Sequence, residues 1–390
     1  MVSTLGSQIS ATAMPLLVLA LTGSPVNAGI VGTAATVPFL LSLPVGALVD
    51  RWNRRTIMLI SQVTASVALF SVPLALWLHN LTIAQLVAVA FVQGCCTMFY
   101  DVAESAALPI IVPPAQRPTA LAQNEARSRG AFLAGPPLGG FLFGLGWFVP
   151  FLADAIGYIF STAGVLLVRE KLQGERTEPS RSLGRDMADG LRWLWKVPFA
   201  RTAVMLVAAS NLVFYALVLT LIVLAGRNGA SPQEVGVMLG IYGGGGLLGA
   251  LTAGWLHRFL RPKTVLISIN WVWAVLLSSM LLPHDPLVLG VIAAGCAFVG
   301  PLWNVVILNY QMAIVPEHMM GRVTSTVMMV TAGVLPVGSL AIGYLLEWLG
   351  PVRSLSVLAV AMLVVAIAAT VSPSLRRMPA TEEIPATAGS

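Results

Sequence analysis

Long apolar runs, separated by short stretches rich in Gly, Pro and charge, make up most of the chain. A helix that spans a lipid bilayer needs about 20 predominantly apolar residues. Runs of about this length recur along the sequence, and we predict an all-α membrane protein with twelve spanning helices. The predicted spans are 5–22, 27–49, 56–78, 83–108, 119–145, 150–168, 201–225, 233–256, 264–282, 286–312, 322–348 and 352–371.

The composition supports a membrane protein. The chain is 57% hydrophobic and 10% charged, whereas a soluble domain is about 45–50% apolar and about 25% charged. The first 25 residues contain no Lys or Arg and no small-residue cleavage site, so they indicate a first span and not a cleavable signal peptide. The chain starts almost inside this span, which suggests that a short cytoplasmic leader is missing.

The Lys and Arg residues are concentrated on one side of the predicted bundle. Most of the 22 fall in loops that share a side, including eight between Arg169 and Arg201. Cytoplasmic loops carry such an excess, so we predict that both termini are cytoplasmic. This bias also accounts for the net charge of +6, and nucleic-acid binding is not needed to explain it.

A charged gap divides the chain into two halves of six predicted spans. Within the gap, Leu183, Met187, Leu191 and Leu194 recur at helical spacing, which predicts an amphipathic helix on the inner membrane surface. The predicted units are a six-helix half (1–168), a cytoplasmic linker with this helix (169–200), a second six-helix half (201–372) and a disordered tail (373–390).

The two halves repeat each other. At an offset of 203, Gly135 and Gly140 match Gly338 and Gly343, and at an offset of 207, Gly29 matches Gly236. Several other small-residue matches occur in the same order along both halves. Paired repeats are an architecture of secondary transporters, in which substrate binds between the halves near the membrane midplane.

The loop after the second span carries a motif. Residues 45–59 read VGALVDRWNRRTIML and resemble the loop signature G-x-L-a-D-r-x-G-r-k of the major facilitator superfamily. Asn53 replaces the usual Gly, and Asn also tolerates a left-handed backbone. The resemblance implies a gate in which Asp50 faces the start of span 11, near Arg322. A purely topogenic loop would explain the arginines but not the acid. The matching residues are Gly46, Asp50, Arg51, Arg54 and Arg55.

Span 5 carries a second motif. GPPLGG, residues 135–140, resembles the G-P-x-x-G-G element of the exporters of this family. Pro136 interrupts helix hydrogen bonding, and Gly135, Gly139 and Gly140 allow close approach of another backbone. We therefore expect this segment at the interface where the halves move against each other. Glycine-rich packing without a role in direction is the alternative.

A further expected motif is incomplete. Antiporters of the family often carry R-x-x-Q-G in span 4, with the Arg linked to proton coupling, but Ala90 stands at the Arg position here. The sequence resembles a branch that includes macrolide efflux proteins and the enterobactin exporter, on the segments LADAIGY, GPLWNVV and VPEHMMGRV. The motifs indicate the family and export, without indicating the substrate.

Ionisable residues inside the spans are candidate functional residues because charges are costly in lipid. At a rise of about 1.5 Å per residue, Asp101 and Glu104 of span 4 come level with Glu125 and Arg127 of span 5, and Asp101 with Arg127 is the best-matched pair. A leftover carboxylate is a possible proton site; the alternative is a cluster that holds the two spans together. Asp154 in span 6 is another candidate, with helix capping or packing as its alternative.

The resemblance also implies that spans 1, 4, 7 and 10 surround a central cavity. Polar, aromatic and Met residues of these spans are candidates for contact with substrate, and wall packing is the alternative for each. They are Gln8, Met14, Tyr100, Asp101, Asn211, Tyr215, Trp303 and Asn304.

These observations predict a monomeric secondary transporter of the cell membrane. We expect proton-coupled export of a lipophilic small molecule (a drug, natural product or siderophore) by alternating access; symport-type uptake is the alternative. An ATP-driven pump is excluded because no Lys follows Gly as a P-loop requires. An enzyme is disfavoured because the four His residues are scattered, and we expect no cofactor or metal, with the proton gradient as the energy source.

Overall fold

The structure is a computed structural model of the 390-residue chain. It describes residues 2–376 apart from 42–44, 47, 50–51, 114–115, 168–182, 257–258, 260–261, 283–284 and 316–318. The described part is helical and contains no strand. Its elements are α1 (Val2–Thr22), α2 (Pro25–Thr36), η1 (Val37–Leu41), α4 (Arg54–Trp77), α5 (Ile83–Ile111), α6 (Arg117–Leu145), α7 (Val149–Leu167), α8 (Leu183–Lys196), α9 (Pro198–Arg227), α10 (Pro232–Leu256), α11 (Pro262–Ser279), α12 (Pro286–Ile314), α13 (Met320–Gly333), α14 (Leu335–Val371) and α15 (Pro373–Arg376).

Eight helices of the described residues are long and apolar enough to cross a membrane. One of them, Arg322–Val371, is 50 residues long and is interrupted at Gly350, whose φ of 76° is not helical. Two further apolar helices, Pro25–Leu41 and Lys263–Ser279, are shorter. Helix α6 is not among the eight, and it carries Arg127 and Arg129 in its first half. The chain is therefore a multi-pass membrane protein.

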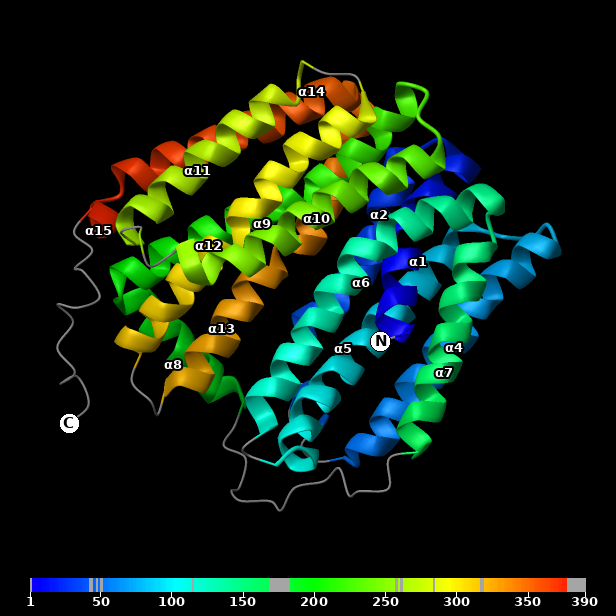
Figure 1. Cartoon of the computed structure of the whole chain (residues 1–390), viewed down its shortest axis with the longest axis horizontal. Helices are drawn as coiled ribbons and strands as arrows, with labels where there is room; N and C mark the ends of the chain where they lie inside the picture. The colour runs from blue at the N-terminus through cyan, green and yellow to red at the C-terminus, as the bar shows by residue number, and fades with distance from the viewer. Residues whose placement is uncertain are drawn as a thin grey trace.

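The helices form two groups that lie side by side (Figure 1), with α1–α7 on the right and α9–α14 on the left. Each group has its own apolar core. Leu17, Leu69 and Phe151 belong to the core of the first half, and Leu217 and Met362 belong to the core of the second half. Each half therefore has its own buried core, distinct from the surface along which the two halves meet.

The two halves contact each other mainly through two pairs of helices, α6 with α10 and α2 with α14, and η1 also contacts α13. In the first pair, a methyl group added at Gly140 would lie 2.8 Å from Cα of Gly236. In the second, a methyl group added at Gly343 would lie 3.2 Å from Cα of Gly29. Only residues without a side chain allow backbones to approach this closely.

These two contacts lie at one end of the bundle, which we call the closed end. The turns that lead into α2 and α10 belong to it: Ser24 Oγ donates a hydrogen bond of 3.0 Å to Glu347 Oε2 of α14, and a methyl group at Gly140 would meet the Pro232 carbonyl. The opposite end, at which α8 lies at the bottom of Figure 1, we call the open end.

The linker helix α8 packs on the second half. Leu194 is buried against Ala200 and Val204, and Gly190 lies against the Arg322 carbonyl of α13. Leu191 and Trp195 remain exposed. The predicted amphipathic helix is thus present, but part of its apolar face contacts α9 and α13 and not a membrane surface, because Gly190 allows α13 to approach.

Candidate functional site

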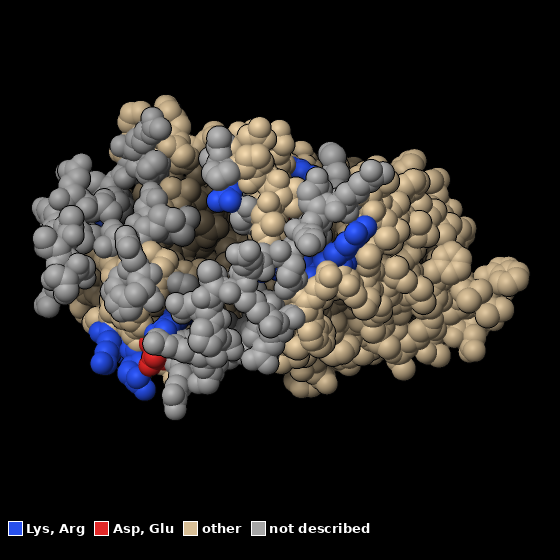
Figure 2. Space-filling view, turned by 90° about the horizontal axis from the view of Figure 1, so that it is seen from below, with Lys and Arg blue, Asp and Glu red and all other residues tan. Residues whose placement is uncertain are grey.

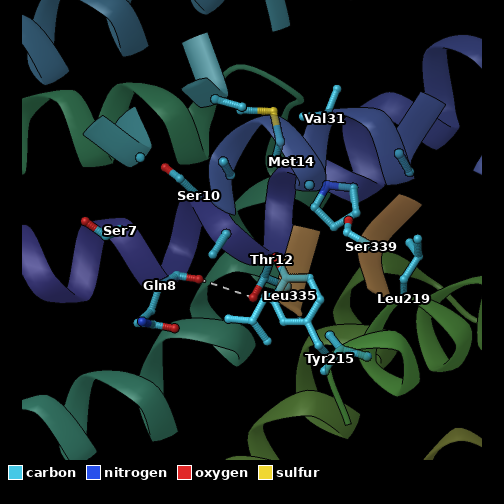
Figure 3. Close-up of a pocket in the computed structure, with 18 of the residues that line it drawn as sticks. Ser7, Gln8, Ser10, Thr12, Met14, Val31, Tyr215, Leu219, Leu335 and Ser339 are labelled. Atoms are coloured by element: carbon cyan, nitrogen blue, oxygen red, sulfur yellow. Dashed lines mark hydrogen bonds between the residues drawn. The ribbon is translucent and has the colours of Figure 1, made fainter. Parts of the chain in front are cut away.

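A cavity of about 600 Å³ lies between the two halves. Its walls come from α1, α2, α5 and α6 of the first half and from α9, α10 and α14 of the second. Figure 3 shows Gln8 and Met14 of α1, Tyr215 of α9 and Ser339 of α14 among the residues around this cavity. The view from below in Figure 2 shows a hollow on the open-end face.

The wall of the cavity is mostly apolar. Met14, Phe132 and Phe214 contribute large apolar surfaces, and a few polar groups such as Gln8 and Asn211 lie among them. None of the described residues that line the cavity is Asp, Glu, Lys, Arg or His. Small-molecule sites are usually concavities of about 300–1,000 Å³ with mostly apolar walls and few polar groups. The cavity therefore suits an uncharged lipophilic molecule of drug size.

Half of the predicted cavity residues lie in this wall. Gln8, Met14, Asn211 and Tyr215 line the cavity, and Asn211 Nδ2 also donates a 3.2 Å hydrogen bond to the Thr331 carbonyl. The remaining candidates, Tyr100, Asp101, Trp303 and Asn304, are not among its described lining residues.

No residue of α12, which the resemblance places at the cavity, is among the described residues that line this cavity. Trp303 of α12 is 3% exposed, and its ring lies 5.9 Å from that of Trp273 within the second half. Asn304 is exposed, and Tyr100 packs against the apolar cluster of the first half that includes Met58 and Met98. The contribution of α2, α6, α10 and α14 to the cavity wall was not predicted, although the Gly-rich pattern of these helices is a signal of close packing between halves.

The GPPLGG segment of α6 lies between α1 and α10. On one side, a methyl group at Gly135 would overlap Gln8, and one at Gly139 would lie 2.8 Å from the Ile9 carbonyl. On the other side, Gly140 faces α10 as described above. Pro136 lines the cavity, so the motif forms both a wall of the cavity and a contact between the halves.

The loop motif is only partly within the described residues. Asp50 and Arg51 lie outside them, and a methyl group at Gly46 would meet nothing within 4 Å. Arg54 Nη1 donates to the Ala106 carbonyl at 2.9 Å, and Arg55 Nη2 donates to the Leu166 carbonyl at 2.8 Å. These two arginines tie the start of α4 to α5 and α7.

Asn53 has a role that the loop signature does not imply. Its φ of −67° is not left-handed, and its side chain accepts hydrogen bonds from the backbone N–H groups of Arg55 and Thr56. Asn is a favoured N-cap residue because it satisfies N–H groups that have no partner within the helix. The proposed tolerance of a left-handed backbone was therefore the wrong reason for Asn at this position.

The charge cluster pairs differently from the predicted pair. Arg127 Nη2 lies 3.1 Å from Glu104 Oε1, and both side chains are about one-quarter exposed, at 28% and 26%. Asp101 is exposed and forms no ion pair with a described residue. The side chain of Glu125 lies outside the described residues. Depth along the helices favoured Asp101 as the partner of Arg127, but the rotation of α5 directs Glu104 towards it.

Asp154 is the one acid of the described spans that is completely buried. Its Oδ2 accepts a 2.6 Å hydrogen bond from Ser10 Oγ of α1 and a 3.3 Å hydrogen bond from Gln93 Nε2 of α5. Its Oδ1 has no hydrogen-bond partner among the described residues. It lies in the second turn of α7, past the capping positions, so helix capping does not explain it.

The fold and the cavity together define a membrane transporter built from two helical halves. The family model for the Major Facilitator Superfamily matches residues 1–334, and the chain belongs to this family, which confirms the resemblance drawn from the loop signature. Family members are transporters and not enzymes.

The chain is similar to three known proteins over most of its length. It is 28% identical to the multidrug efflux pump Tap of Mycolicibacterium fortuitum, covering 96% of this chain and 93% of Tap. It is 22% identical to macrolide efflux protein A of Streptococcus pyogenes, covering 81% of this chain and 80% of that protein. The nucleoside transporter NupG has the same fold, with a TM-score of 0.75 at 13% identity, covering 97% and 98% of the two chains.

Proposed function

We propose that this protein is a secondary active exporter of uncharged lipophilic small molecules and that it works by alternating access as a proton-coupled antiporter. The observation that carries the proposal is the cavity between the halves, which is closed at one end by paired glycines and whose described lining residues are mostly apolar and include no charged side chain. Similarity to two efflux proteins supports the direction of transport.

Alternating access needs a second state in which the opposite end closes. In the present state the halves meet at the closed end through small residues, which can separate without breaking buried side-chain packing. Gly140 and Gly236 hold no interlocked side chains, and each half has its own buried core, which Leu16, Leu19 and Leu219 of the opposite half only border. The halves can therefore rock as rigid bodies around the cavity.

The proposed topology has twelve spans with both termini in the cytoplasm of a cell whose plasma membrane holds the protein. The twelve are the eight long helices with Arg322–Val371 divided at Gly350, the two shorter apolar helices, and α6. Lys and Arg appear on the open-end face in Figure 2, as expected of a cytoplasmic face. The state described here would then be open to the cytoplasm.

Transport into inverted membrane vesicles tests the proposal. Vesicles from an efflux-deficient strain that expresses the protein should accumulate radiolabelled chloramphenicol, an uncharged probe, when the lumen is acidified, and a protonophore should abolish accumulation. Vesicles with Gly140→Ala, which places a methyl group in the contact between halves, should not accumulate the probe; Gly164→Ala, where a methyl group meets nothing within 4 Å, should behave as wild type. Accumulation by right-side-out vesicles instead would contradict export and indicate uptake.

A further inference from the structure

Asp154 lies directly behind the cavity wall. Its two hydrogen-bond donors, Ser10 and Gln93, are both lining residues of the cavity. One layer of side chains therefore separates a completely buried carboxyl group from the space between the halves. The hydrogen bonds join three helices, α1, α5 and α7, at this point.

The surroundings of Asp154 contain polar groups but no cation among the described residues. From α1 it is faced by Gly6 and Ser10, and from α5 by Gln93. From α4, Ser66 Oγ donates to the carbonyl of the neighbouring residue Ala155. The nearby titratable side chain is Tyr158, one turn along α7, whose hydroxyl lies 2.9 Å from Ser7 Oγ.

A carboxyl group in this position would destabilise the folded protein if its only role were packing. Charged groups within a membrane are costly unless paired, and they commonly mark ion or proton pathways. A buried polar atom without a partner adds a further cost. Oδ1 is such an atom, and it points at Gly6, where any side chain would overlap it. Protonation of Oδ1 would remove the charge while Oδ2 keeps both donors.

We infer that Asp154, held by Ser10 and Gln93, is the residue that binds and releases the coupling proton through the cavity wall. This inference rests on the proposed antiport. A proton that binds at Oδ1 neutralises the carboxylate in one state and leaves through the cavity in the other. Ser10 belongs to α1, which also contacts the GPPLGG motif through Gln8, so a change of charge at Asp154 acts on the helix that packs against the moving interface.

The proton site can be tested without a transported substrate. Infrared difference spectra of the purified protein in lipid nanodiscs, recorded as the pH is changed, should show a protonated-carboxyl band that Asp154→Asn lacks. Thr162→Val, two turns further along α7, should keep the band. Ser10→Ala should shift the pH range over which the band appears, because the carboxylate loses a donor. Identical titrations of wild type, Asp154→Asn and Ser10→Ala would overturn the inference. If Asp154→Asn does not fold, the Ser10→Ala titration decides.

A transport assay then tests whether Asp154 couples proton movement to export. In proteoliposomes, Asp154→Asn should keep exchange of radiolabelled chloramphenicol across the membrane but lose accumulation driven by a pH gradient. Accumulation by Asp154→Asn at the wild-type level would overturn the coupling role even if the infrared band is assigned to Asp154. If the wild type does not move chloramphenicol in either direction, the proposed export of this probe fails, while the infrared titration still decides whether Asp154 is a proton site.

Discussion

Gly140 of α6 and Gly236 of α10 face each other across the boundary between the halves, so closely that a methyl group on Gly236 would lie 2.9 Å from Cα of Gly140. The internal repeat equates Gly140 with Gly343 and Gly236 with Gly29. Gly343 and Gly29 also face each other, on α14 and α2. The closed end is thus built from two contacts that the repeat relates, one on each side of the cavity.

Substituting Gly140 should therefore change the thermal stability and the closed end of the protein far more than substituting a glycine on an open helix face. Ala for Gly stabilises a helix interior by up to about 1 kcal/mol where space allows. We expect Gly164→Ala to leave the thermal unfolding temperature unchanged or higher. Gly140→Ala should lower it and should increase labelling of a Ser24→Cys variant by an impermeant maleimide, because the closed end is forced apart. Equal behaviour of the two alanine variants would show that the closed end does not depend on this contact.

Ser24 and Glu347 allow the closed end to be locked. Their side chains are 3.0 Å apart on opposite halves, so Ser24→Cys with Glu347→Cys should react with a short bifunctional thiol reagent. We expect cross-linking by a bis-methanethiosulfonate, which forms reducible disulfides, to stop chloramphenicol transport and reduction to restore it, since alternating access requires the halves to separate there. The two single-cysteine variants are the controls. Full transport by the cross-linked protein would contradict rocking about this end.

The Glu104–Arg127 pair predicts an order of stabilities. Removing one partner leaves the other charge partly buried and unpaired, which costs about 1–3 kcal/mol. Glu104→Gln and Arg127→Gln should each lower the thermal unfolding temperature more than the double variant does. Asp101→Asn, at an acid that forms no ion pair among the described residues, should have a smaller effect. Additive effects of the two single changes would show that the pair contributes no coupling energy.

Reporter fusions test the proposed sidedness. A reporter that is active only in the cytoplasm should be active when fused after Arg185 or Arg376, because positively charged segments stay inside. It should be silent after Gly229 or Asp285, which follow odd-numbered spans. Activity at Gly229 would place the α9–α10 turn in the cytoplasm and would contradict the twelve-span topology.

Much of the architecture was readable from patterns along the chain. Apolar runs of membrane-spanning length predicted the helices because lipid leaves the backbone no other way to satisfy its hydrogen bonds than within a helix or a closed barrel. The repeat of Gly29 with Gly236 and of Gly140 with Gly343 indicated two related halves. The loop signature indicated the family, which the family model confirms.

Tertiary structure decided which faces of the helices meet. The repeat equates Gly29 with Gly236, but contact occurs between Gly29 and Gly343, because a pattern relates equivalent positions and packing joins non-equivalent ones. Depth along α5 favoured Asp101 as the partner of Arg127, whereas the rotation of the helix directs Glu104 to it. Asp154 acquires its donors from residues 144 and 61 positions away. Apolar patterns specify burial in lipid, but they do not specify which neighbour a buried side chain will contact.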